Sequence, residues 1–263
     1  MQGLSYSSLS AARSALAGFV TIEHSSYAIS NHPQVARYLK GVFNIKPSMP
    51  RYQRIWDIRL VLDKLRNWGD VKKLKELTYK LCILLALLGV ARTQLLHAFD
   101  VNKIEVDSNQ VVLRVDKLMK TDRPGKVGHE LKLLAYPPDR RLCVVSTIQQ
   151  YLDKTRPFRK SGEQNQLFLG LNEPHKPVTK DTIARWIRDM LALSGIDVGC
   201  FKAHSVRAAS VSAAKVQFVS TQKIMKRANW TQEKTFNQFY NKEITTGELA
   251  YDTALLNSVE SID

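Results

Sequence analysis

The side chains best suited to chemistry lie in the C-terminal third of this 263-residue chain. His204 and Arg207 are three positions apart, so a helix places both on one face. Trp230 and Tyr240 follow further along. Far upstream, Arg92 comes directly after an apolar run, where a charge is tolerated only with a partner. These residues are far apart in the sequence, so the fold would have to bring them together for a common chemistry.

The motifs of several other chemistries are missing from the sequence. None of the histidines has a His, Cys, Asp or Glu at a recognised metal-ligand spacing; they are His24, His32, His97, His129, His175 and His204. The phosphate-cradling patterns GxxxxGKS/T and GxGxxG are absent, and so is the nucleophile elbow GxSxG. We therefore expect no metal ion, no ATP and no other cofactor.

The charge balance predicts a polyanionic partner. Lys plus Arg is 39 and Asp plus Glu is 24, so the net charge is 39 − 24 = +15, with a pI near 9.8. Such an excess favours nucleic acid, although a merely solvated basic surface is the alternative. The separated cysteines Cys82, Cys143 and Cys200 form no CxxC pair, which argues against a zinc ribbon or a disulfide framework.

The hydrophobic pattern predicts a soluble protein. The longest apolar run, Leu81 to Val90, has ten residues, whereas a membrane-spanning helix needs about 20. We interpret it as a buried core helix. The N-terminal stretch lacks the basic start and continuous apolar segment of a secretory signal.

The elements that must position the candidate residues are mainly helical, with one small antiparallel sheet. Hydrophobic periodicity predicts helices at 5–21, 33–43, 55–68, 71–88, 143–154, 179–193 and from 203 to the end. Alternating patterns predict strands at 104–106, 111–115 and 130–135, with a further short strand at 168–169. The polar, basic segment 117–128 is expected to be an exposed loop between two strands.

The composition divides the chain into two parts. Residues 45–52 contain two prolines, a serine and basic residues, which is typical of a linker. We expect a front section at 1–48 and a main domain at 49–263 that ends in a tail helix at about 246–259. The tail carries an apolar stripe that folds back onto its own domain unless another surface covers it.

The order Arg, Lys, His-x-x-Arg, Trp, Tyr resembles that of the tyrosine recombinases, the phage-type integrases and their relatives. The resemblance runs from about Trp56 to the end. The phrase ANWTQEKTFNQFYNKE and the loop KTDRPG are most similar to the recombinases of DIRS-type retrotransposons. The front phrase SYSSLSAARSAL resembles the end of the family's helical, SAM-like core-binding domain, here short, as if its first helices were missing.

The resemblance implies a DNA strand-cleaving and rejoining enzyme, serving integration or recombination of a mobile element. It would work through a 3′-phosphotyrosine link without metal or ATP. Tyr240 would be the nucleophile, and Arg92 and Arg207 would hold the scissile phosphate.

The remaining roles follow from the same resemblance. His204 would be an acid/base or a hydrogen-bond donor to the phosphate, and Trp230 would donate its indole N–H. Lys120 would protonate the leaving 5′-oxygen. The residues expected to bind DNA are Lys117, Arg123, Lys126 and Lys202.

The resemblance also implies the partners. We expect the protein to clamp double-stranded DNA and to form a tetramer on two DNA sites, with the C-terminal segment docking on the neighbouring protomer. Similarity to eukaryotic elements implies a nuclear location. We expect no membrane partner.

Some features depart from the family pattern. The interval between Trp230 and Tyr240 is one residue longer than usual and puts Phe239 at the expected position, which leaves Tyr251 as a second candidate nucleophile. Lys117 and Lys126 compete with Lys120 as general acid.

Three alternatives therefore stay open. The first alternative is a catalytically silent, domesticated DNA-binding protein. The second is an enzyme that relaxes DNA as a type IB topoisomerase does. For Arg92, the structural alternative is a buried ion pair with Asp100 or Asp57.

Overall fold

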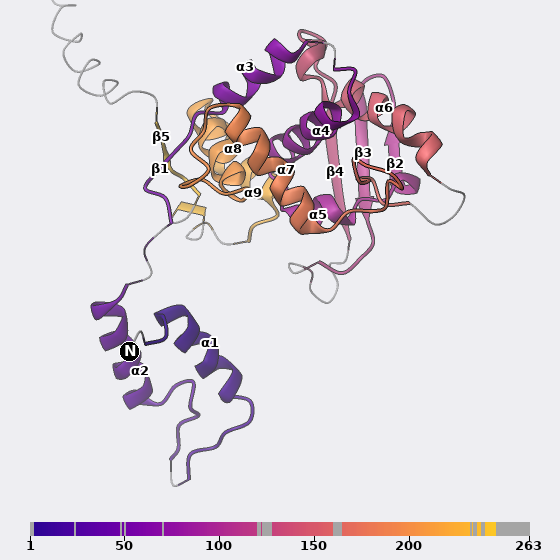
Figure 1. Cartoon of the computed structure of the whole chain (residues 1–263). Helices are drawn as coiled ribbons and strands as arrows, with labels where there is room; N and C mark the ends of the chain where they lie inside the picture. The colour runs from indigo at the N-terminus through magenta and orange to yellow at the C-terminus, as the bar shows by residue number, and fades with distance from the viewer. Residues whose placement is uncertain are drawn as a thin grey trace, which may run out of the picture. The chain divides into compact units, whose positions relative to one another are not determined.

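The chain forms two compact units, Met1–Arg51 and Tyr52–Asp263, in a computed structural model (Figure 1). The structure describes residues 3–23, 25–47, 49, 51–69, 71–119, 122, 128–159, 165–231, 233, 236–237 and 240–245. The first unit contains helices α1, Tyr6–Leu16, and α2, Pro33–Ile45. The Tyr6 and Phe43 rings meet edge to face, with centroids 5.3 Å apart. Among the described residues of these helices only Leu39 is buried, so this unit has little core of its own.

The second unit is mainly helical with a small antiparallel sheet, as the sequence predicts. Its helices are α3 Ile58–Trp68, α4 Leu74–Leu88, α5 Thr93–Ala98, α6 Val144–Thr155, α7 Lys180–Leu193, α8 Ser205–Val216 and α9 Thr221–Ala228. Short 3-10 turns lie at Val101–Lys103, Arg140–Leu142 and Arg156–Phe158. The antiparallel sheet has the order β2-β3-β4, with β2 Ile104–Val106, β3 Gln110–Val115 and β4 His129–Leu134.

Helix α4 is the centre of the second unit. Every residue from Leu77 to Leu87 is buried, because α4 packs against α5, α6, α7 and α8. Figure 1 shows the sheet and α6 on one side of α4, and α8 and α9 on the other. Among the described residues, no helix combines the length and apolar character needed to cross a membrane.

Strand β4 buries alternate side chains, whereas β3 buries Val111, Val112 and Leu113 in succession. Leu113 is paired with Leu131 and Val111 with Leu133, and all four are buried. The alternation in β4 is the period-2 pattern expected of a strand with one buried face. The tight turn before β3 is closed by Asp107, whose carboxylate accepts the Asn109 and Gln110 N–H groups.

The C-terminal region differs from its predicted form. We predicted helix from residue 203 to the end, but Glu243–Ile244 forms strand β5, which pairs in parallel with β1, Arg54–Ile55. For the same reason the helix predicted to start at 55 begins at Ile58, after Asp57 as its N-cap. A two-residue parallel ladder depends on a partner far away in the chain, so local periodicity carries no signal for it.

Smaller differences concern element ends. The helix predicted at 5–21 ends at Leu16, and the one predicted from 71 begins at Leu74. The strand predicted at 168–169 is an isolated bridge between Leu169 and Pro177. Such boundaries depend on caps and tertiary contacts more than on periodicity.

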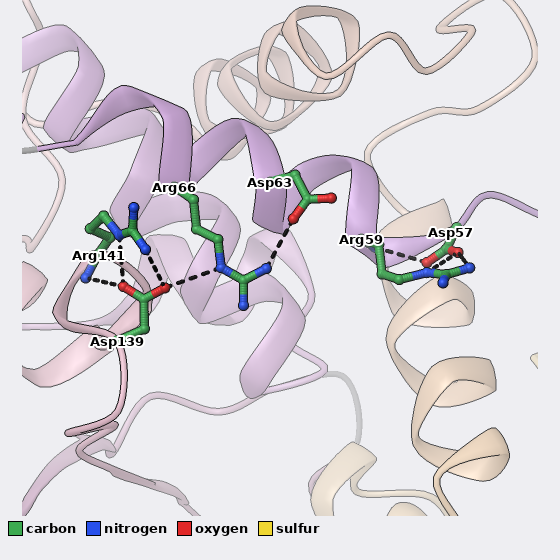
Figure 2. Close-up of polar contacts among 6 residues, drawn as sticks. All are labelled: Asp57, Arg59, Asp63, Arg66, Asp139 and Arg141. Carbon is green, nitrogen blue, oxygen red and sulfur yellow. Dashed lines mark hydrogen bonds and ion pairs between the residues drawn. The ribbon is translucent and has the colours of Figure 1, made fainter.

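A cluster of arginines and aspartates fastens α3 to the turn before α6 (Figure 2). Arg66 Nε lies 3.1 Å from the Asp139 carboxylate, which also accepts from Arg141 Nε at 2.9 Å. The hydrogen bond from Arg141, helped by that from Arg66, lowers the pKa of Asp139 to about 2. Asp139 therefore stays ionised and holds both guanidinium groups.

Candidate functional site

The turn after α4 positions Arg92. The Ala91 N–H bonds the Ala86 carbonyl at 3.1 Å and the Val90 N–H bonds the Leu87 carbonyl at 3.3 Å, the pattern of a Schellman C-cap. Val90 has φ of +47°, a strained conformation for a β-branched residue, which the surrounding packing must maintain. The next helix, α5, begins directly after Arg92, so the side chain projects from a constrained corner.

Close packing fixes this corner against the sheet. A Cβ on Gly89 would lie 2.7 Å from Leu131 of β4 and 2.7 Å from the Leu85 carbonyl oxygen. Only glycine therefore permits this approach of the turn to the sheet.

Helix α8 brings His204 and Arg207 to the same corner. His204 is its N-cap residue, and Arg207 lies in its first turn. Ser210 donates to the Leu87 carbonyl at 2.6 Å, which satisfies a backbone acceptor at the end of α4. Trp56 donates from its indole N–H to Ser205 Oγ at 2.9 Å. The first bond fixes α8 against the end of α4, and so Arg207 near Arg92, while the second ties the start of α8 to the segment between β1 and α3.

Arg207 is a buried cation without a carboxylate partner in the described part of the chain. The residue is 4% exposed, and Nη2 donates to the Ala228 carbonyl at 3.3 Å. Its Nε is buried and has no hydrogen-bond acceptor among the described residues. The guanidinium lies over the rings of Trp230 and Tyr240, 5.1 and 5.7 Å from their centroids.

The pKa of Arg207 reflects this environment. Burial, followed by the charge of Arg92, lowers it to about 10, while Tyr240 acts in the opposite direction. Two arginines held together without an acid are costly unless an anion compensates them. The arrangement therefore suits a phosphate.

The site is a cleft of about 570 Å³ with a basic lining. Arg92, His204, Arg207 and Tyr240 all line it. Every permanently charged residue of the lining is basic; the further ones are Arg185, Arg188 and Lys202. A second cavity of about 220 Å³ also borders Arg92 and Arg207.

Helix α8 fixes the backbone around Tyr240 through Ser212. Ser212 donates to the Tyr240 carbonyl at 3.1 Å and accepts from the Lys242 N–H at 3.0 Å. The Tyr240 ring lies 4.2 Å from the Trp230 ring, centroid to centroid. One helix therefore carries Arg207 and also fixes the backbone of the candidate nucleophile.

His204 is exposed at the cleft and contacts Tyr52. Its Nε2 lies 3.0 Å from Tyr52 Oη, and the two rings are stacked with centroids 5.6 Å apart. Tyr52 is itself buried and also packs on Phe201.

His129 has a structural role. Its Nε2 bonds Asp122 at 2.7 Å, and its Nδ1 lies 3.3 Å from Asn229 Nδ2. The Met119 N–H, followed by His129, holds the pKa of Asp122 below its usual range. These bonds connect Asp122, from the segment between β3 and β4, to the end of α9.

The structure brings together most of the predicted site residues that it describes. Arg92, His204, Arg207 and Tyr240 share the cleft with Lys202, and Trp230 packs on Tyr240. Lys117 is exposed after the end of β3. Several predicted positions lie outside the described residues: Lys120, Arg123, Lys126, Phe239, Tyr251 and the tail at 246–259.

The alternative for Arg92, a buried ion pair with Asp100 or Asp57, is not what the structure shows. Asp57 caps α3 and pairs with Arg59, and Asp100 caps the 3-10 turn that follows it. Within the described ranges no ion pair joins Arg92 to either acid. Nor does any group of three His, Cys, Asp or Glu there come close enough to bind a metal ion.

Three residues of the site escaped the sequence analysis. Arg185 and Arg188 are exposed on α7 and line the cleft. Their spacing of three, on the polar face of a helix that was predicted, was an available signal. For Tyr52 the sequence carried no such signal, because this residue lies in the linker-like segment, far from His204 in the chain.

Comparison with known proteins identifies the fold. No protein-family model and no curated protein sequence matches the chain. The structure is similar to the Tn1549 transposon integrase in complex with transposon right-end DNA, with 14% identity, a TM-score of 0.58, and 98% of this chain and 80% of that one covered.

Two further structures are similar. The XerA recombinase has 13% identity and a TM-score of 0.54, covering 86% of this chain and 73% of that one. The XerH site-specific recombinase, bound to its difH substrate before cleavage, has 10% identity and a TM-score of 0.55, with 99% and 72% covered. These similarities establish that the fold is that of the tyrosine recombinases.

Proposed function

We propose that this chain, which has the tyrosine recombinase fold, cleaves and rejoins DNA strands through a covalent link between Tyr240 and a phosphate. The observation that carries the proposal is the environment of Arg207. It is a buried guanidinium with an unpaired Nε, beside Arg92 and Tyr240, in a cleft lined by basic side chains. A phosphodiester supplies the negative charge that this site lacks.

The chemistry of the proposal is the one that the resemblance to the tyrosine recombinases implies for these side chains. Tyr240 Oη attacks the phosphorus, and the bond to the 5′-oxygen breaks, which leaves a 3′-phosphotyrosine. The tyrosine proton passes to solvent, His204 donates a hydrogen bond to a phosphate oxygen, and the leaving 5′-oxygen takes a proton from the general acid, for which Lys120 is our candidate. Arg92 and Arg207 stabilise the charge that develops on the non-bridging oxygens. Attack by a 5′-hydroxyl reverses the step and frees Tyr240.

The surrounding basic residues would hold the duplex. Arg185, Arg188 and Lys202 line the cleft, and phosphate contacts of this kind position DNA without reading its sequence. We extend this role to the lysines and arginine of the loop between β3 and β4: Lys117, Arg123 and Lys126.

The biological context rests on the sequence resemblance. We place the activity in the integration or recombination of a DIRS-like mobile element, in a nucleus, with the first unit as part of a core-binding domain. Assembly would be a tetramer on two DNA sites, with the tail at 246–259 docked on a neighbour. An apolar groove of about 850 Å³ between α3, α8 and α9 supports this assembly, because it offers a receiving surface for an apolar stripe.

Covalent capture tests the proposal. The protein is mixed with nicked duplex DNA, quenched in detergent, and examined for protein that carries DNA under denaturing conditions. We expect adduct in the wild type and in Tyr251→Phe, and none in Tyr240→Phe, with DNA binding unchanged in all three. Adduct lost only in Tyr251→Phe would reassign the nucleophile.

The same assay distinguishes the alternatives. Binding without adduct in the wild type would favour the silent DNA-binding protein. Adduct together with relaxation of supercoiled DNA, without need of a second site, would favour the topoisomerase-like activity.

A further inference from the structure

We infer that Tyr52 is a positioning residue for His204, whose hydroxyl selects the tautomer of the imidazole at the cleft. The inference rests on the proposed function, in which His204 acts at the scissile phosphate. Tyr52 is 8% exposed and packs on Phe201, with ring centroids 5.2 Å apart. A buried, packed phenol has a fixed direction, so it can orient an exposed histidine.

The hydrogen bonds at Tyr52 define the tautomer. The Lys202 backbone N–H points at Tyr52 Oη at 3.4 Å, so this oxygen already accepts a hydrogen bond. A phenol has one hydrogen to donate, and His204 Nε2 lies 3.0 Å away. The oxygen could also accept from Nε2–H, but the Tyr52 hydrogen, in a buried side chain, would then have no acceptor among the described residues. We therefore assign Tyr52 as the donor to Nε2, which leaves the proton of the neutral ring on Nδ1.

Tyr52 also belongs to a segment, residues 52–56, that holds both sides of the site. Trp56 of this segment bonds Ser205, the residue after His204. The Ile55 carbonyl accepts the Thr245 N–H at 2.8 Å, just beyond Tyr240. Arg54 pairs with Glu243 at 3.4 Å. All of these contacts lie within the second unit, of which Tyr52 is the first residue.

The tautomer has a chemical consequence. With Nε2 occupied by Tyr52, the nitrogen that bears a proton is Nδ1, and this is the group with which neutral His204 donates to a phosphate oxygen. Without the Tyr52 hydroxyl, the ring loses this preference and part of its orientation. Loss of the partner that orients a metal-ligating histidine lowers activity about 10- to 100-fold, and we expect an effect of that order here.

The test uses Tyr52→Phe, which keeps the ring and its packing and removes the hydroxyl. Protein labelled with ¹⁵N-histidine is measured by NMR at a pH where the ring is neutral, and the His204 signals are assigned by their loss in His204→Ala. We expect unprotonated Nε2 and protonated Nδ1 in the wild type, and a shift toward the opposite tautomer in Tyr52→Phe. Tyr136→Phe, an exposed tyrosine of the same unit, should leave the spectrum unchanged.

Adduct formation on nicked duplex DNA provides the functional readout. We expect Tyr52→Phe to slow it about 10- to 100-fold with DNA affinity retained. In the His204→Ala background the same change should have no further effect, because Tyr52 acts through His204.

An equal loss in both backgrounds, or identical His204 spectra in wild type and Tyr52→Phe, would overturn the inference. If no variant forms adduct but the spectra differ as expected, the proposed function fails while the orientation of His204 by Tyr52 stands. The spectroscopic and functional results are thus distinguishable.

Discussion

Arg207 shows how one side chain can indicate a ligand. A buried guanidinium normally has an acid within reach, because desolvation of an unpaired charge is expensive. Here its described neighbours are two aromatic rings, one carbonyl and a second arginine. The rings stabilise the cation through their faces without neutralising it, which leaves the charge available to an anion.

Replacing Arg207 by lysine tests this interpretation at the residue scale. Lysine keeps the charge but loses the planar fork. We expect adduct formation on nicked DNA to fall about 10²- to 10³-fold, the typical cost of removing one donor that stabilises a transition-state charge. DNA affinity should stay close to that of the wild type.

The matched control is Arg185→Lys, which changes an exposed arginine of the same cleft. It should leave adduct formation nearly unchanged. A wild-type rate in Arg207→Lys would contradict a fork-like contact between Arg207 and the phosphate.

At the scale of elements, the site depends on how α4 ends. The corner at Gly89 and Val90 aims Arg92, and Ser210 of α8 bonds to the last turn of α4. Ser212, further along α8, fixes the Tyr240 backbone. Helix α8 is therefore the common support of the cation and the candidate nucleophile.

Gly89→Ala should disturb this corner. Its Cβ would meet the Leu85 carbonyl oxygen and Leu131 at 2.7 Å, so backbone or sheet must move. We expect the free energy of unfolding of the second unit to fall by about 1–3 kcal/mol, as for other overpacked sites, and adduct formation to fall with it. Denaturant titration measures the first effect.

Gly41→Ala is the control for this substitution. Gly41 lies inside α2, and a Cβ there meets nothing within 4 Å, so alanine should not reduce stability. Unchanged stability of Gly89→Ala would show that the corner is looser than its packing indicates.

Asp139 makes a second element-scale prediction, about pH. Arg141 and then Arg66 lower its pKa to about 2, whereas an unfolded aspartate titrates near about 3.9. A lowered carboxyl pKa stabilises the fold above the unfolded value, and this contribution is lost as the pH falls through about 2. Asp139→Asn should therefore lower the melting temperature at neutral pH, and its difference from wild type should shrink as the pH falls from about 4 to about 2.

Asp63→Asn controls for a general effect of losing an acid on α3. Within the cluster drawn in Figure 2, Asp63 pairs with Arg66, and its side chain is largely exposed. Its melting temperature should change less than that of Asp139→Asn. A pH-independent difference for Asp139→Asn would contradict the ion-pair explanation.

At the scale of the whole molecule, the net charge of +15 predicts that DNA affinity depends strongly on salt. The cleft arginines on α7 should contribute directly to this salt dependence. We expect Arg188→Gln to reduce the slope of log K against log salt by about 1, since it removes one phosphate contact. Arg156→Gln should leave the slope unchanged, because Arg156 pairs with Asp153 and lies outside the cleft lining. Equal slopes in wild type and Arg188→Gln would place Arg188 away from the DNA.

The sequence by itself determined the fold class and the order of the candidate site residues. Helices such as α4 and α7, and the hairpin of β2 and β3, follow from local hydrophobic periodicity, which each segment carries within its own residues. The spacing of His204 and Arg207 is likewise local, since one helical turn joins them.

The tertiary structure alone decided how these residues meet. Tyr52 contacts His204 across 152 positions, β1 pairs with β5, and α7 turns its arginines into the cleft. Nothing in the local pattern marks such contacts, because they arise only when distant segments pack on the same core. The unpaired Nε of Arg207 is likewise a property of its packed surroundings. Side-chain periodicity specifies which face of an element is buried, and only packing specifies what that face will touch.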